Sequence, residues 1–124
     1  GSGFSISYPE NFHASPVANG VQIMGERQDA MVRVDMLQAP AGVDLNSYVA
    51  ENAKKMYHGA AVGGGSVGGQ PARVIHTSGN GSSIETYFMM QGQKVYRITE
   101  SWPNSLESSF KPGLDKSVQS FKLK

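Results

Sequence analysis

Two patterns in the chain carry residues whose types and spacing could support chemistry. The first is GGGSVG, residues 63–68, which fits the G-x-G-x-x-G fingerprint of dinucleotide-binding loops. That fingerprint needs a strand before it and a helix after it, because the pyrophosphate rests on the helix N-terminus. Here a predicted helix ends at Gly59 and the next predicted strand begins at Pro71, so the order is reversed. We therefore expect a flexible helix-to-strand loop and no nucleotide or other cofactor.

The second pattern is a row of three ionisable residues, His76, Glu85 and Glu100, on three successive predicted strands. A two-residue turn at Asn80-Gly81, a strong hairpin signal, places His76 opposite Glu85. A two-residue turn at Gly92-Gln93 places Glu85 opposite Glu100. The three side chains are thus predicted to leave one face of the sheet as neighbours.

This row has two interpretations. Because two carboxylates directly opposite each other repel, a chain that tolerates them could use them as a metal site or a general acid/base cluster. The alternative is an ordinary polar end of a sheet, where solvent screens the carboxylates and a protonated His76 offsets the repulsion. We adopt the second interpretation, an ordinary polar end of the sheet, and assign no catalytic, cofactor-binding or metal residue. His76, Glu85 and Glu100 remain the only metal candidates, and we expect no tight metal binding.

A predicted antiparallel sheet positions the row. Strands are predicted where apolar and polar residues alternate or where residues with high β-propensity cluster. These stretches are residues 4–8, 21–24, 31–37, 71–77, 83–91 and 94–102. His13 is expected in a solvated turn. A helix is predicted over 44–58, with Asp44 as its N-cap, and a second from Asn104, which Pro112 kinks or splits.

The run YFMM, residues 87–90, places large apolar side chains on both faces of one strand. A strand that is apolar on both faces has to be covered on both. We therefore predict an α+β fold, with an antiparallel sheet of about six strands flanked by helices on both faces.

Composition limits the class of protein. The 124 residues fit a single domain over 1–124, and Gly1-Ser2 is typical of a cloning remnant. The net charge of +1 and the lack of a basic stripe argue against nucleic acid as a partner. The chain has no cysteine, which excludes disulfides and thiolate chemistry, and no apolar run long enough for a transmembrane segment.

Four stretches resemble the PsbP-like family: FSISYPENF, GGQPARVIHT, QGQKVYRITESWP and FKPGLDKSVQSFKL. The resemblance spans nearly the whole chain in order, and its motifs are structural. It implies an antiparallel sheet sandwiched by helices. The family includes a lumenal subunit that assists the oxygen-evolving centre, bacterial exported proteins and lipoproteins, and a Ran-binding import factor. It has no known shared active site, so no catalytic residue is implied.

The expected function is therefore a non-catalytic binding or accessory module of an exported bacterial protein. Its partner would be another protein and its location extracytoplasmic, in the periplasm or at the cell surface, with or without a lipid anchor. One alternative is a chaperone or adaptor that uses an exposed apolar face, formed by Val74, Tyr87, Met89, Tyr96 and Ile98. A third is a small metal-binding protein built on the row.

Overall fold

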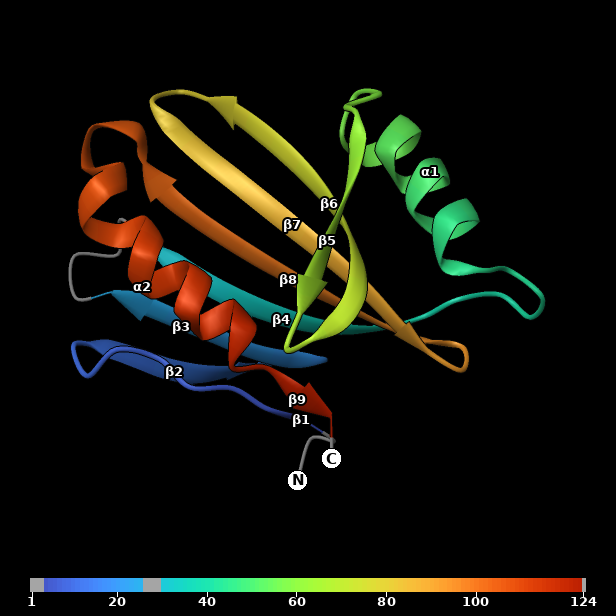
Figure 1. The fold of residues 1–124 in the computed structure, drawn as a ribbon, viewed down its shortest axis with the longest axis horizontal. Helices are drawn as coiled ribbons and strands as arrows, with labels where there is room; N and C mark the ends of the chain where they lie inside the picture. The colour runs from blue at the N-terminus through green and yellow to red at the C-terminus, as the bar shows by residue number, and fades with distance from the viewer. Residues whose placement is uncertain (1–3, 26–29, 124) are drawn as a thin grey trace.

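The computed structural model describes residues 4–25 and 30–123 (Figure 1). The Gly1-Ser2 pair, expected to be a cloning remnant, lies outside the described residues. In chain order the elements are β1 (Phe4–Ser5), β2 (Phe12–Val17), β3 (Gly20–Gly25), β4 (Met31–Gln38), α1 (Leu45–Met56), β5 (Val62–Val67), β6 (Gln70–Gly79), β7 (Ser82–Gln91), β8 (Lys94–Pro103), a 3-10 turn (Asn104–Leu106), α2 (Glu107–Gln119) and β9 (Lys122–Leu123).

Seven strands form one antiparallel sheet in the order β2-β3-β4-β8-β7-β6-β5. The predicted antiparallel sheet is confirmed, but it is larger than the six strands expected. The predicted first strand is short and lies outside it, because β1 pairs with β9 in a separate two-stranded sheet. The two strands that the sequence did not reveal, β2 and β5, form the two edges.

The prediction of a flexible loop at the glycine run is wrong, because residues 62–67 form β5 and pair with β6. Backbone hydrogen bonds need no side chains, so glycines can occupy an edge strand. At Gly65 the small residue is required by space: a Cβ there would lie 2.7 Å from Val74 Cγ2. The run therefore lets the edge strand approach β6 closely.

The placement of His13 in a turn is also wrong. His13 lies on β2 opposite Met24, with its side chain exposed. The segment FHASPV buries only Phe12 well, so it shows no apolar alternation. Proline and polar residues suit an edge strand, where one side of the backbone needs no partner.

Both helices form where the sequence places them. The Asp44 carboxylate accepts a hydrogen bond from the Ser47 backbone N–H at 2.8 Å, which confirms the N-cap of α1. Gly59 follows with a φ of 75°, the left-handed conformation that ends a helix. A 3-10 turn precedes α2, and Pro112 lies inside α2 without dividing it.

The apolar side chains form two clusters. Tyr87 and Met89 belong to the larger cluster, with Leu114 and Val118 of α2. Phe88, between them on the strand, belongs to the smaller cluster with Val49 of α1. Successive side chains of a strand point to opposite faces, so the two helices pack against different faces of β7.

The helices are short relative to the sheet. In Figure 1, α2 crosses in front of β4 and β8, whereas α1 lies beside β5 and β6. The contacts of α1 are with β5, β6 and β7. Helical cover of the α1 face is partial, because an open groove lies between the sheet and the end of α1.

Candidate functional site

The predicted row of ionisable residues is present. His76 pairs with Glu85, and Glu85 pairs with Glu100, as the two hairpin turns predict. The predicted exposure to solvent is wrong for Glu100, whose exposed fraction is 0%. His76 is exposed, as predicted. Helix α2 packs against β8 and removes Glu100 from solvent, so water does not screen it.

Helix α2 brings two further charged residues to the row. Lys111 Nζ lies 2.8 Å from Asp115 Oδ2 and 3.5 Å from Glu85 Oε2. Glu85, Glu100 and Asp115 each contribute a carboxylate oxygen, and these oxygens all lie within 4.8 Å of one another. We call Glu85, Glu100, Asp115 and Lys111 the acidic cluster.

His76 is not part of the acidic cluster. Its ring lies 6.4 Å from the ring of Trp102, the residue whose indole N–H donates to Glu107. Sequence reasoning therefore found two members of the cluster and missed Lys111 and Asp115. Their one signal was an i,i+4 Lys–Asp spacing on α2, which is also common on solvent-facing helices.

The acidic cluster changes the proton affinity of its members. Burial, followed by a hydrogen bond to the Asp115 carboxylate and by the negative charges of Asp115 and Glu85, raises the pKa of Glu100 to about 10. Burial alone would lower the pKa of Lys111, but Asp115, Glu85 and Glu100 outweigh it and raise that pKa. Near neutral pH the cluster thus holds a proton on Glu100 and a charged ammonium group on Lys111. The acidic cluster therefore favours bound protons and cations.

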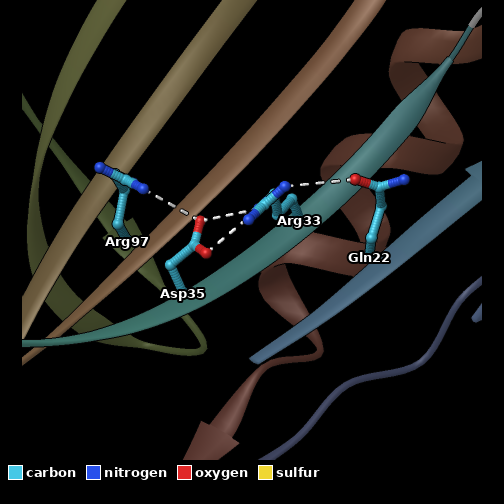
Figure 2. A network of polar contacts seen from close by, with 4 residues as sticks. All are labelled: Gln22, Arg33, Asp35 and Arg97. Carbon is cyan, nitrogen blue, oxygen red and sulfur yellow. Dashed lines mark hydrogen bonds and ion pairs between the residues drawn. The ribbon is translucent and has the colours of Figure 1, made fainter. Parts of the chain in front are cut away.

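The other face of the sheet carries a second polar network, which Figure 2 shows. Arg33 Nε lies 3.1 Å from Asp35 Oδ1, and Arg97 Nη2 lies 3.2 Å from Asp35 Oδ2. Arg33 also donates to Gln22 Oε1 at 3.4 Å. Strands β3, β4 and β8 supply these residues, so one carboxylate joins two arginines across neighbouring strands.

Arg33, Asp35 and Arg97 of this network line a groove of about 490 Å³ between the sheet and the end of α1. We call it the α1 groove. Asp35 is buried, whereas the Arg33 side chain is 38% exposed and the Arg97 side chain 21%. Besides these three residues, the lining consists of Met31, Met56, Tyr57, His58, Thr77, Ile84, Thr86 and Thr99.

A larger hollow of about 810 Å³ lies where the β5–β6 and β7–β8 turns meet the C-terminal segment. Its lining includes one charged residue, Lys122, among apolar and uncharged polar residues. Binding sites usually combine apolar walls with a few convergent polar groups. The α1 groove fits that description better, because two arginines and a carboxylate converge in it.

The apolar face proposed for a chaperone or adaptor is not exposed. Tyr87, Met89, Tyr96 and Ile98 are 9%, 4%, 3% and 0% exposed, and Val74 is half-buried. These side chains belong to the larger apolar cluster with α2 and Phe121. The sequence could not show this, because it leaves open which strand face each helix covers. The face is core and not an interaction surface.

Solved structures of PsbP, LpqN and Mog1 match this arrangement of strands and helices, which is therefore of the PsbP/Mog1 type. The solution structure of cyanobacterial PsbP from Synechocystis matches with a TM-score of 0.70 at 13% identity, over 99% of this chain and 88% of that one. LpqN of Mycobacterium tuberculosis, involved in cell envelope biogenesis, matches with a TM-score of 0.60 at 12% identity, over 98% and 83%. A variant of the protein Mog1 matches with a TM-score of 0.60 at 11% identity, over 98% and 90%.

No model of a known protein family matches the sequence, and no curated protein matches it. At these identities the structural likenesses show the fold alone. They support the resemblance to PsbP-like proteins at that level. Among the helices of residues 4–25 and 30–123, none is long and apolar enough to cross a membrane.

Proposed function

We propose that the chain is a non-catalytic binding module that acts outside the cytoplasm and holds an acidic segment of another protein in the α1 groove. The observation that carries the proposal is the pair of arginines that share one carboxylate in an open groove. Their charges exceed that of Asp35, so the groove offers a surplus of positive charge to a partner.

The chemistry of the groove supports a polypeptide partner. Arginine presents a planar fork of donors that matches a carboxylate, and Asp35 holds Arg33 and Arg97 in place before a partner arrives. Around them, Met56 is 58% exposed and Ile84 36% exposed. Apolar side chains beside oriented arginines fit a segment that combines acidic and apolar residues.

Binding without catalysis is favoured by the exposure of the histidines and by their lack of orienting hydrogen bonds. All three histidines, His13, His58 and His76, are exposed. In the described parts of the chain, no histidine side chain makes a hydrogen bond that would orient it as a general base. The extracytoplasmic location is supported by the lack of cysteine and by the fold shared with LpqN, which is involved in cell envelope biogenesis.

The experiment is site-specific photo-crosslinking in the source cell. A photoreactive residue replaces Thr99 in the groove or, as the matched control, Ser108 on α2. We expect one protein to be crosslinked from position 99 and not from position 108. The partner is then purified, and its affinity is measured for the native chain, Arg97→Glu and the control Lys54→Glu.

Arg97→Glu should weaken binding by about tenfold or more, with an affinity that falls as salt increases, because the charge contact is reversed. Lys54→Glu, an equal charge change on the exposed side of α1, should have little effect. Equal affinities of the native chain and Arg97→Glu would refute the groove as the binding site. Crosslinking from position 108 alone would place the partner elsewhere.

A further inference from the structure

We propose that the acidic cluster beneath α2 is a binding site for a hard divalent cation, with Lys111 as the displaceable internal cation that occupies it when no metal is bound. This site is on the opposite face from the α1 groove and is independent of the proposed function. Its ligands would be Glu85 of β7, Glu100 of β8 and Asp115 of α2.

The arrangement of oxygens fits one ion. One carboxylate oxygen from each residue lies within 4.8 Å of the other two. Calcium holds oxygens at roughly 2.3–2.6 Å, so two ligands of the same ion can be up to about 5 Å apart. Carboxylates are the ligands that calcium, magnesium and manganese prefer, and the cluster offers neither imidazole nor thiolate. The chemistry therefore favours a hard cation.

Several buried carboxylate oxygens of the acidic cluster lack hydrogen-bond partners among the described residues. Glu100 is fully buried, and neither of its carboxylate oxygens accepts a hydrogen bond from a donor among the described residues; its neutral form shares its own proton with the neighbouring Asp115 carboxylate. Glu85 Oε2 and Asp115 Oδ1 are also buried and accept no hydrogen bond from a described residue, although Lys111 Nζ lies 3.5 Å from Glu85 Oε2 as an ion pair. Buried polar atoms are normally paired, because leaving them unpaired costs free energy. A cation between the three carboxylates would satisfy all of them.

Lys111 has the properties of a displaceable occupant. Its ammonium group contacts Asp115 and Glu85 and lies 5.4 Å from the centre of the Trp102 ring. Its side chain is 32% exposed and that of Asp115 is 40% exposed, so the cluster opens to solvent at this point. The flexible lysine side chain can move outward when a metal ion enters, and the same opening admits the ion.

The native chain contains a reporter of this exchange. Trp102 is the single tryptophan, and Lys111 is the cation over its ring. Displacement of the ammonium group changes the electrostatic environment of the indole. Metal entry should therefore change tryptophan fluorescence together with the heat of binding.

The test uses the full chain after treatment with a chelator, titrated with Ca²⁺ and separately with Mn²⁺ by calorimetry and tryptophan fluorescence. We expect saturable binding of one ion, with matching midpoints in both measurements. Glu100→Gln and Asp115→Asn should abolish it, because each replaces a carboxyl group that the ion would coordinate; at Glu100 the entering ion displaces the proton, which is released to solvent. The control Glu51→Gln changes an exposed carboxylate on α1 and should leave binding unchanged.

Lys111→Met gives the sharpest outcome. If Lys111 competes with the metal, its removal should tighten binding by about tenfold or more, because a nearby positive charge is lost. A lysine that only stabilises the fold would leave metal affinity unchanged or lower it.

The proposal is overturned if neither the folded native chain nor folded Lys111→Met binds Ca²⁺ or Mn²⁺ at about 10 mM, above the range of weak extracellular calcium modules. It is also overturned if binding persists in Glu100→Gln. Circular dichroism establishes that each variant is folded.

Discussion

Glu100 is the residue whose environment departs most from its sequence context. Its neighbours on β8 alternate as a half-buried strand, and a glutamate there is expected at the solvent-exposed end. Instead its side chain lies under α2, next to Glu85 and Asp115. Burial of an ionised carboxylate is costly, so the group retains a proton or requires a cation.

The raised pKa of Glu100 predicts how stability depends on pH. Its pKa is 4.5 when unperturbed and about 10 in the folded chain, so between these values the folded state binds the extra proton. The stabilisation is complete below about pH 4.5 and is lost as pH rises toward 10, by up to about 1.4 kcal/mol per pH unit. Glu100→Gln removes this proton uptake. In metal-free buffer with a chelator, the variant should be more stable than the native chain at pH 8, with a smaller difference at pH 5.

Urea unfolding of both proteins at pH 5, 6, 7 and 8 measures this difference. The conservative variant Glu51→Gln, at an exposed residue on α1 outside the cluster, is the control and should follow the native pH dependence. Parallel pH profiles for the native chain and Glu100→Gln would contradict the assignment of the proton to Glu100.

At the scale of elements, β5 shows how an edge strand can form from glycines. Gly63 and Gly65 both have φ values outside the left-handed region, so alanine can adopt their backbone conformation. Their surroundings differ: a Cβ at Gly63 would be in ordinary contact with Val74 O at 3.8 Å, whereas one at Gly65 would lie 2.7 Å from Val74 Cγ2.

Alanine substitutions at these two glycines are expected to change stability in opposite directions. Gly63→Ala should leave stability unchanged or raise it by roughly 0.5–1 kcal/mol, because alanine loses less backbone entropy in a strand. Gly65→Ala should lower stability by about 1–3 kcal/mol, because Val74 has to move. Denaturant unfolding of the two variants measures both. Equal effects would mean that β5 does not pack against Val74 as described.

For the whole molecule, the order of the strands predicts where local unfolding begins. Strands β7 and β8 are central and carry side chains of both apolar clusters, whereas β2 and β5 are at the edges. Amide hydrogen exchange should therefore be slowest in β7 and β8 and fastest in β2 and β5. Exchange in β5 as slow as in β8 would show that the glycine strand is held by more than its pairing with β6.

The long-range contacts of the molecule also place its two candidate sites on different faces. Arg33, Asp35 and Arg97 converge because β4 and β8 are neighbours, although the residues are far apart in the chain. The acidic cluster forms because α2 returns across β8 and β4. The sequence predicts neither group of residues, because the network depends on the order of the strands and the acidic cluster on the position of α2.

Residues adjacent in the chain set the geometry of the turns and of the helix cap. Asn80-Gly81 adopts the positive φ values that its turn requires, 54° and 80°, and Gly92 has a φ of 63°. These turns set the register that places Glu85 between His76 and Glu100. The N-cap at Asp44 was equally predictable, because capping depends on residues adjacent in the chain.

Contacts between distant residues set which side chains cover each face of the sheet and which strands pair at its edges. The burial of Glu100, the addition of Asp115, the strand formed by the glycine run and the coverage of Tyr96 by the C-terminal segment all depend on contacts between distant residues. Turns and caps are set by the few residues that form them. Packing depends on the order of strands in the sheet and the path of α2 across it, which no local pattern specifies.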